Sequence, residues 1–151
     1  YLAPEWRTLS LEKATQMIYR KAGRVTAPPH PLEVDFTEPI RMTGYELIKI
    51  GETWEVDVWW ETYGPLSTNY LVFVHLIGPD DALIAQHDHV AGTDAYPTSQ
   101  WAVGTMLRDR FFLNVPGGVC DQCTLHVGLY TEQGRLPLRD GGDAVEIGTG
   151  G

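Results

Sequence analysis

Hydrophobic and polar residues alternate along most of the chain after residue 31, and the alternation is sharpest over residues 53–62. A period of two places successive side chains on opposite faces of a β-strand. The strand predicted here has one apolar face that packs inward and one wet, acidic face that carries a single tryptophan. The inward residues are Trp54, Val56, Val58 and Trp60, and the outward residues are Glu55, Asp57, Trp59 and Glu61.

Residues 70–77 form a nearly unbroken apolar run of mostly β-branched and aromatic side chains. Such a run is typical of a strand buried on both faces. The next four residues, Gly78-Pro79-Asp80-Asp81, favour a turn, because proline presets φ and aspartate tolerates turn dihedrals. Residues 82–87 return as a second strand, so the two segments are predicted to form a β-hairpin at the centre of a sheet.

Further short segments with strand character lie on both sides of this hairpin, separated by glycine- and proline-rich turns. They cover residues 32–36, 40–50, 105–115, 124–130, 135–139 and 144–147, and a long loop covers 90–104. Seven to nine such strands predict an all-β fold, an antiparallel β-sandwich of immunoglobulin-like or jelly-roll-like form. The sandwich domain is predicted to cover residues 32–148, and residues 149–151 are expected to be a flexible tail.

The first 31 residues differ, because their apolar residues recur at helical spacing. The spacing predicts one N-terminal α-helix over residues 11–22, with Ser10 as the N-cap and Gly23 as the stop. The segment 27–31 is rich in proline and predicts an extended linker. The helix either packs on the sandwich or ends a linker, and the sequence leaves both alternatives open.

Length and charge narrow the class of protein. A chain of 151 residues is one domain on size grounds. Its net charge of −9 argues against a nucleic-acid partner, because phosphate binding relies on clustered lysine and arginine. No apolar run approaches the roughly 20 residues that span a bilayer. The chain begins at Tyr1 without a signal peptide, so we expect it to be a piece of a longer protein.

Cys120 and Cys123 form a single C-x-x-C pair that follows a proline-glycine turn. One pair cannot supply four zinc ligands, and no βαβ pattern accompanies it to support a thioredoxin-type motif. Two alternatives stay open. The cysteines form a local disulfide, which would suit an extracytoplasmic domain, or they are two free thiols.

Seven short segments, in order along the chain, carry a resemblance to a known family. They are Ile40-Arg41-Met42-Thr43-Gly44-Tyr45-Glu46-Leu47, Gly51-Glu52-Thr53 leading to Trp59-Trp60, Val72-Phe73-Val74-His75-Leu76, Ala85-Gln86-His87-Asp88, Tyr96-Pro97-Thr98-Ser99 before Trp101, Val127-Gly128-Leu129-Tyr130, and Arg135-Leu136-Pro137. Together they resemble the C-terminal extracytoplasmic β-sandwich domain of large bacterial membrane proteins of the glycosyltransferase-39 type, which are dolichyl-phosphate-mannose mannosyltransferase-like. The chain departs from the family pattern around Cys120 and Cys123.

The resemblance implies a domain on the extracytoplasmic face of the bacterial cell membrane, attached to transmembrane helices outside this chain. The transferase's catalytic residues belong to that membrane part, so none is carried over and no cofactor is expected. None of the three serines, Ser10, Ser67 and Ser99, lies in a Gly-x-Ser-x-Gly elbow either. We therefore expect a non-catalytic accessory or scaffold domain, not an enzyme, whose partner is the parent membrane domain.

Three histidines, His75, His87 and His89, are weak candidates for a zinc site. His87 and His89 share one face of their strand. His75 would join them if the hairpin turn holds three residues with Asp81 left-handed, and would lie on the opposite face if the turn holds two. Satisfied or solvent-facing histidines are the favoured interpretation, so no metal is predicted.

An alternative function is a carbohydrate-binding module that presents an envelope glycan to the parent protein. Sugar binding uses flat aromatic rings together with polar groups that bond to hydroxyls. The candidate glycan-binding residues are Trp59 with Glu61 on the acidic strand face, and Tyr96 with Trp101 in the long loop. The competing interpretation is that Trp101 plugs the end of the sandwich beneath its own loop, and we favour it for that residue.

Overall fold

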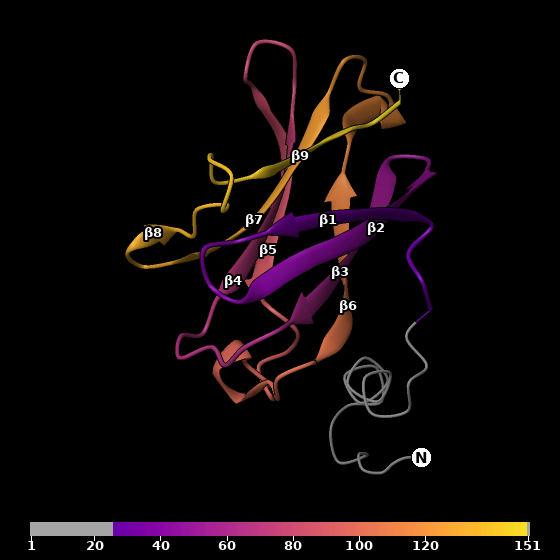
Figure 1. The fold of residues 1–151 in the computed structure, drawn as a ribbon. Helices are drawn as coiled ribbons and strands as arrows, with labels where there is room; N and C mark the ends of the chain where they lie inside the picture. The colour runs from indigo at the N-terminus through magenta and orange to yellow at the C-terminus, as the bar shows by residue number, and fades with distance from the viewer. Residues whose placement is uncertain (1–25, 151) are drawn as a thin grey trace.

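The computed structural model describes residues 26–150, and within this range it contains nine strands and two short 3₁₀ turns. The strands form two antiparallel sheets, as Figure 1 shows, so the all-β prediction is confirmed. The first sheet has the order β1-β2-β3-β6, and the second has the order β5-β4-β7-β8, with β9 also paired to β7.

The strands of the first sheet are β1 (His30–Asp35), β2 (Ile40–Ile50), β3 (Thr53–Thr62) and β6 (Met106–Asn114). Those of the second sheet are β4 (Leu71–Ile77), β5 (Leu83–Val90), β7 (Thr124–Thr131), β8 (Gly134–Arg135) and β9 (Val145–Gly148). The 3₁₀ turns are η1 (Thr98–Gln100) and η2 (Pro116–Gly118).

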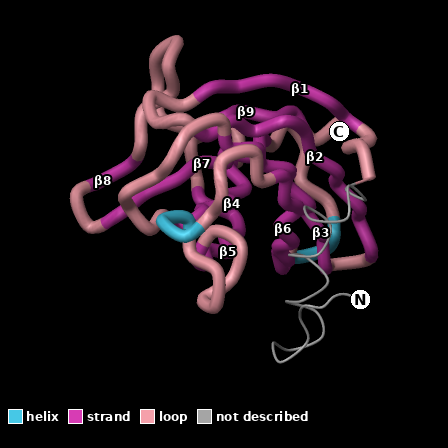
Figure 2. Tube along the Cα trace, turned by 60° about the horizontal axis from the view of Figure 1, so that its bottom comes forward, coloured by secondary structure: helices cyan, strands magenta, loops and turns pink. Residues whose placement is uncertain are grey.

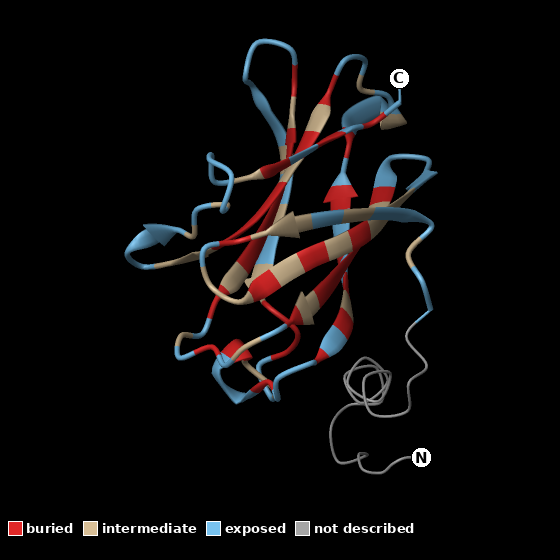
Figure 3. Cartoon of the chain, viewed as in Figure 1, coloured by how far each residue is buried: buried red, intermediate tan, exposed pale blue. Residues whose placement is uncertain are grey.

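One hydrophobic core lies between the two sheets (Figure 3). The four apolar side chains predicted to face inward from β3 are all buried in it, and so are alternate residues of β4 and β7. Burying a large apolar side chain contributes about 1.5–3 kcal/mol, so this shared layer is the main source of stability. The residues from β4 and β7 are Val72, Val74, Leu76, Leu125, Val127 and Leu129.

The predicted hairpin is present as β4 and β5, but only β4 is central, since β5 is an edge strand. Asp81 in the turn is left-handed, with φ of 59°. The pairing then slips by one residue, because Ile77 pairs with Leu83 whereas Leu76 pairs with Ala85. This bulge exchanges the faces of all the β5 residues that follow it.

The outward face of β3 is not the wet surface that the alternation predicted, and that prediction is wrong. Asp57 and Trp59 are only 1% and 2% exposed. The Arg110 guanidinium donates to both carboxylate oxygens of Asp57, at 3.1 and 3.3 Å. The Trp59 indole N–H donates to the carbonyl oxygen of Thr26 at 2.7 Å, so the chain before β1 contacts this face.

The two ends of the predicted domain also differ from expectation. Strand β1 begins at His30, inside the predicted linker, while the predicted helix over residues 11–22 lies outside the described residues. Thr149 is buried rather than part of a free tail. Its hydroxyl donates to the Cys123 carbonyl oxygen at 2.9 Å, and its own carbonyl accepts from Lys49 Nζ at 2.8 Å.

Candidate functional site

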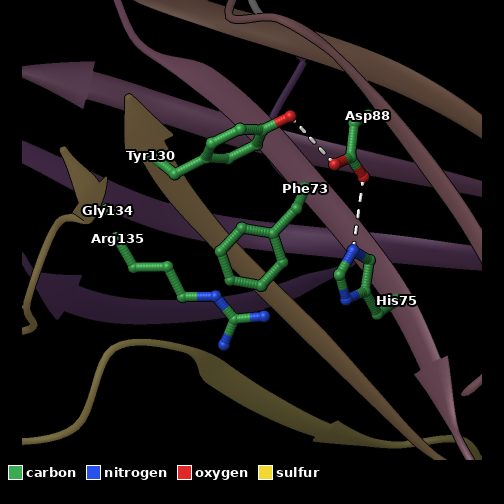
Figure 4. Close-up of a pocket in the computed structure, with 6 residues that line it drawn as sticks. All are labelled: Phe73, His75, Asp88, Tyr130, Gly134 and Arg135. Atoms are coloured by element: carbon green, nitrogen blue, oxygen red, sulfur yellow. Dashed lines mark hydrogen bonds and ion pairs between the residues drawn. The ribbon is translucent and has the colours of Figure 1, made fainter. Parts of the chain in front are cut away.

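A pocket of about 210 Å³ opens on the outer face of the second sheet. Its lining comes from four strands, β4, β5, β7 and β8, and Figure 4 shows the side chains turned toward one another. The lining residues are Phe73, His75, Asp88, Tyr130, Gly134 and Arg135.

Strand register brings these residues together. Phe73 of β4 pairs with Asp88 of β5 on one side and with Gly128 of β7 on the other. A side chain at Gly128 would place its Cβ 2.5 Å from two carbons of the Phe73 ring. The glycine therefore allows the ring to lie against the β7 backbone, where it forms the floor of the pocket. Tyr130 pairs with Arg135 of β8, which places both beside that floor.

A carboxylate links two of the polar groups in the pocket (Figure 4). The Tyr130 hydroxyl donates to Asp88 Oδ2 at 3.0 Å. On the other side of the carboxylate, His75 Nε2 lies 3.4 Å from Asp88 Oδ1, which is within ion-pair distance. This nitrogen is buried and makes no hydrogen bond to any residue that the structure describes. Burial lowers the pKa of His75, although the Asp88 charge acts to raise it. The lowered pKa keeps the imidazole neutral at pH 7. Burial and Asp88 both raise the pKa of the Tyr130 phenol.

Arg135 supplies the positive charge at the site. Its guanidinium carbon lies 4.0 Å from the centre of the Phe73 ring, which is cation–π geometry. One terminal nitrogen of Arg135 also lies 3.3 Å from Asp143 Oδ1. The pocket thus holds an aromatic floor, one cation, one carboxylate and two neutral polar groups.

The side chains of the pocket can bind a polar ligand through hydrogen bonds. The six lining residues include hydrogen-bond donors and acceptors, but no serine, threonine, cysteine or lysine that could act as a nucleophile. A neutral histidine next to a carboxylate can exchange protons with a ligand.

The three candidate metal ligands are divided between two faces of the second sheet. His75 lies on the outer face with Asp88, whereas His87 pairs with Val74 and so lies on the inner side. His87 and His89 pack against Phe111 of the first sheet, with ring centroids 5.5 and 4.1 Å away. The left-handed Asp81 did not bring His75 and His87 together, because the bulge after the turn reverses the faces. Within residues 26–150 no group of three or more His, Cys, Asp or Glu side chains is placed to hold a metal ion.

The four candidate glycan ligands lie in two separate places, and neither tryptophan is open to a sugar. Trp59 is covered as described above, and Glu61 beside it lies 3.7 Å from the Arg41 guanidinium. Trp101 is 5% exposed, and its indole N–H donates to the Tyr96 carbonyl oxygen at 2.7 Å. The Tyr96 ring stacks on Trp101 at 6.2 Å, so the pair closes the long loop on itself.

Sequence reasoning missed the pocket because its polar residues come from four strands whose register the pattern does not specify. One signal was present in the sequence. Gly128 lies on the outward face of β7 between His126 and Tyr130, and a glycine inside a strand often marks the close approach of another group. Its partner here is the Phe73 ring.

Cys120 and Cys123 are joined in a disulfide, with their Cα atoms 5.6 Å apart. The bond lies in the connection between η2 and β7, and Cys123 is buried.

Comparison of the chain with protein-family models, characterised proteins and solved structures finds no significant match. None of the helical structure in the described range is long and apolar enough to cross a bilayer.

Proposed function

We propose that this chain is a non-catalytic accessory domain on the extracytoplasmic face of a bacterial membrane protein of the glycosyltransferase-39-like type. The disulfide between Cys120 and Cys123 is the observation that supports the extracytoplasmic location. Disulfides persist in oxidising compartments and are rare in the cytosol. The resemblance of the seven ordered sequence segments supports the proposed family.

The non-catalytic role is supported by what the family-like residues do in the fold. The Thr98 hydroxyl of the Tyr-Pro-Thr-Ser segment donates to the Thr68 carbonyl oxygen at 2.6 Å and accepts from the Tyr70 N–H at 3.0 Å. Those bonds fasten the long loop to the start of β4. Trp60 fills the core, and Gly128 makes room for Phe73. These residues have structural roles, which is typical of a scaffold.

The strand order supports an immunoglobulin-like sandwich over a jelly roll. Strands β1, β2, β3 and β6 form one layer, and β5, β4, β7, β8 and β9 form the other. The chain changes sheets after β3, after β5 and again after β6. That order matches the Greek-key connections by which immunoglobulin-like domains divide their strands between two sheets.

The coding sequence that precedes Tyr1 tests this proposal. We expect it to encode many apolar helices of about 20 residues each, which together form a membrane domain. A soluble catalytic domain directly before Tyr1 would overturn the proposed setting.

A carbohydrate-binding role is the second candidate. It gains no support from Trp59 or Trp101, which are buried, and depends instead on the pocket of the second sheet.

A further inference from the structure

We propose that the pocket formed by β4, β5, β7 and β8 binds one neutral, hydroxyl-bearing sugar ring. The inference rests on the proposed function only for where the domain would meet such a ligand, as a terminal residue of an envelope glycan. The site itself is defined by the six lining residues, none of which was among the predicted glycan ligands.

The charges around the pocket favour a neutral ligand. An anion would be attracted by Arg135 but would meet Asp88 and the nearby Asp143, while a cation would meet the Arg135 guanidinium. His75 does not change this balance, because burial favours its neutral form. His126 of β7 pairs with His75, and Glu146 of β9 pairs with His126. The Glu146 carboxylate adds negative charge at the sheet surface. A ligand of either sign would therefore oppose at least one fixed charge.

The pocket also has hydrogen-bonding capacity that the protein leaves unused. Within residues 26–150, His75 Nε2 is buried without a hydrogen-bond partner. Arg135 uses one of its five N–H groups, on Asp143, and Asp88 accepts one hydrogen bond, from Tyr130. His75 Nε2 faces Asp88, so the positions open to a ligand are the remaining N–H groups of Arg135 and the remaining lone pairs of Asp88. Sugar hydroxyls both donate and accept, and thus match a site that presents a carboxylate and a guanidinium together.

The size and walls of the pocket fit a single ring. Its volume of about 210 Å³ is below the roughly 300–1,000 Å³ of sites for drug-sized molecules. Phe73 is 1% exposed beneath the Arg135 guanidinium, so the walls that a ligand can reach are Tyr130 and Arg135 (Figure 4). Carbon-bound hydrogens of a pyranose would contact the Tyr130 ring and the stem of Arg135, and its hydroxyls would point to Asp88.

The test is a titration of the ¹⁵N-labelled 151-residue chain, followed by NMR, with three sets of probes. The first is a panel of neutral methyl hexopyranosides, the second is a hexuronate, and the third is inorganic phosphate. We expect the neutral glycosides to shift the amide signals of the lining residues saturably, with dissociation constants of about 1–10 mM.

Two variants and a control locate the binding. Asp88→Asn removes a charged acceptor and should weaken binding about tenfold or more, because hydrogen bonds to charged groups are the stronger ones. Tyr130→Phe removes the hydroxyl that orients Asp88 and should weaken it about 3- to 10-fold. Asp80→Asn, on the exposed hairpin turn outside the lining, removes the same charge and should bind like the original chain.

Each result decides the inference. Saturable shifts at the lining residues, lost in Asp88→Asn but not in Asp80→Asn, support it. Binding of hexuronate or phosphate but not of the neutral glycosides overturns it, as does the absence of shifts at the lining residues with every neutral glycoside. If Asp88→Asn does not fold, Tyr130→Phe decides in its place. The coding sequence before Tyr1 is independent of all these outcomes, so a failure of the sugar site and a failure of the proposed setting are distinguishable.

Discussion

His87 Nδ1 accepts a hydrogen bond from the backbone N–H of Phe112 at 2.9 Å. His87 lies on β5 and Phe112 on β6, the edge strands of the two different sheets, which run side by side in Figure 2. His89, two residues further along β5, places Nε2 3.2 Å from the Arg110 carbonyl oxygen. The two-residue spacing of His87 and His89 on β5 thus matches the two-residue spacing of Phe112 and Arg110 on the edge of β6. Side chains cover backbone groups that would otherwise template pairing with another chain.

The His87 contact predicts a pH dependence of stability. Burial and the neighbouring His89 lower the pKa of His87 below its usual 6.5, so the folded state favours the neutral ring that accepts from Phe112. The stability from this group is present above pH 6.5 and is lost as the pH falls below that value. His87→Asn retains an acceptor near the Nδ1 position but does not titrate. We expect urea unfolding at several pH values to show a smaller loss below pH 6.5 in this variant.

Two further variants separate the hydrogen bond from the titration. His87→Leu removes the acceptor of the Phe112 N–H and should lower the free energy of unfolding by about 0.5–1.5 kcal/mol at pH 7.5, because water can reach this exposed N–H. The lowered pKa of His75 acts in the same direction as that of His87, so some loss at low pH should persist in His87→Asn. An unchanged pH profile in His87→Asn would contradict the role assigned to His87.

Asp109 on the inner face of β6 predicts the opposite pH dependence. It is fully buried, and burial raises its pKa to about 7, although its Oδ2 accepts from the Gly92 N–H at 3.0 Å. An acid whose folded pKa is raised stabilises the fold most at low pH, and this contribution is lost as the pH rises from about 3.8 to about 7. Asp109→Asn keeps an oxygen for Gly92 and removes the charge.

The expected outcome is a gain in stability of Asp109→Asn relative to the original chain that grows between pH 5 and pH 8. Thermal unfolding at both values measures it, with Asp80→Asn as the exposed control. A difference between Asp109→Asn and the original chain that does not change with pH would show that the carboxyl is not buried in its neutral form.

The contact between Phe73 and Gly128 predicts a strong local effect of a small substitution. Gly128→Ala would place a methyl group 2.5 Å from the Phe73 ring, and overpacking of this kind costs about 1–3 kcal/mol. Gly148→Ala in β9 is the matched control, because nothing lies within 4 Å of the added Cβ. Urea unfolding should show a large loss for the first variant and little change for the second. Equal stabilities would mean that the Phe73 ring does not rest on β7.

The disulfide predicts how the two cysteines react in protein taken from cells. Cys120 and Cys123 should resist alkylation by iodoacetamide until a reductant is added, and mass spectrometry reads the difference. Replacing both with serine should lower the free energy of unfolding by about 2 kcal/mol, since a short loop loses little entropy on closure. Alkylation of both thiols without reductant would contradict the bond.

Most of the strands could be predicted from the sequence, because the period-two pattern that defines them is the same pattern that fills the core. Trp54 and Trp60 are buried where the alternation places them. Trp59 points away from the core, and its burial there could not be predicted, because it depends on a contact with Thr26, which lies in a segment without strand character. The positions of His75 and His87 depended on a single bulge, and no residue in the turn specifies it. The pocket needs four strands in register, so it emerges only from the three-dimensional pairing.

The proposed location outside the cytoplasm can be tested directly with Asp80→Cys in the proposed full-length parent protein. This position lies on the exposed hairpin turn, and both native cysteines are held in a disulfide, so the introduced thiol is the one that reacts among the described residues. Intact spheroplasts are treated with a membrane-impermeant maleimide before or after lysis. We predict equal labelling in the two samples, and labelling that occurs only after lysis would contradict an extracytoplasmic domain.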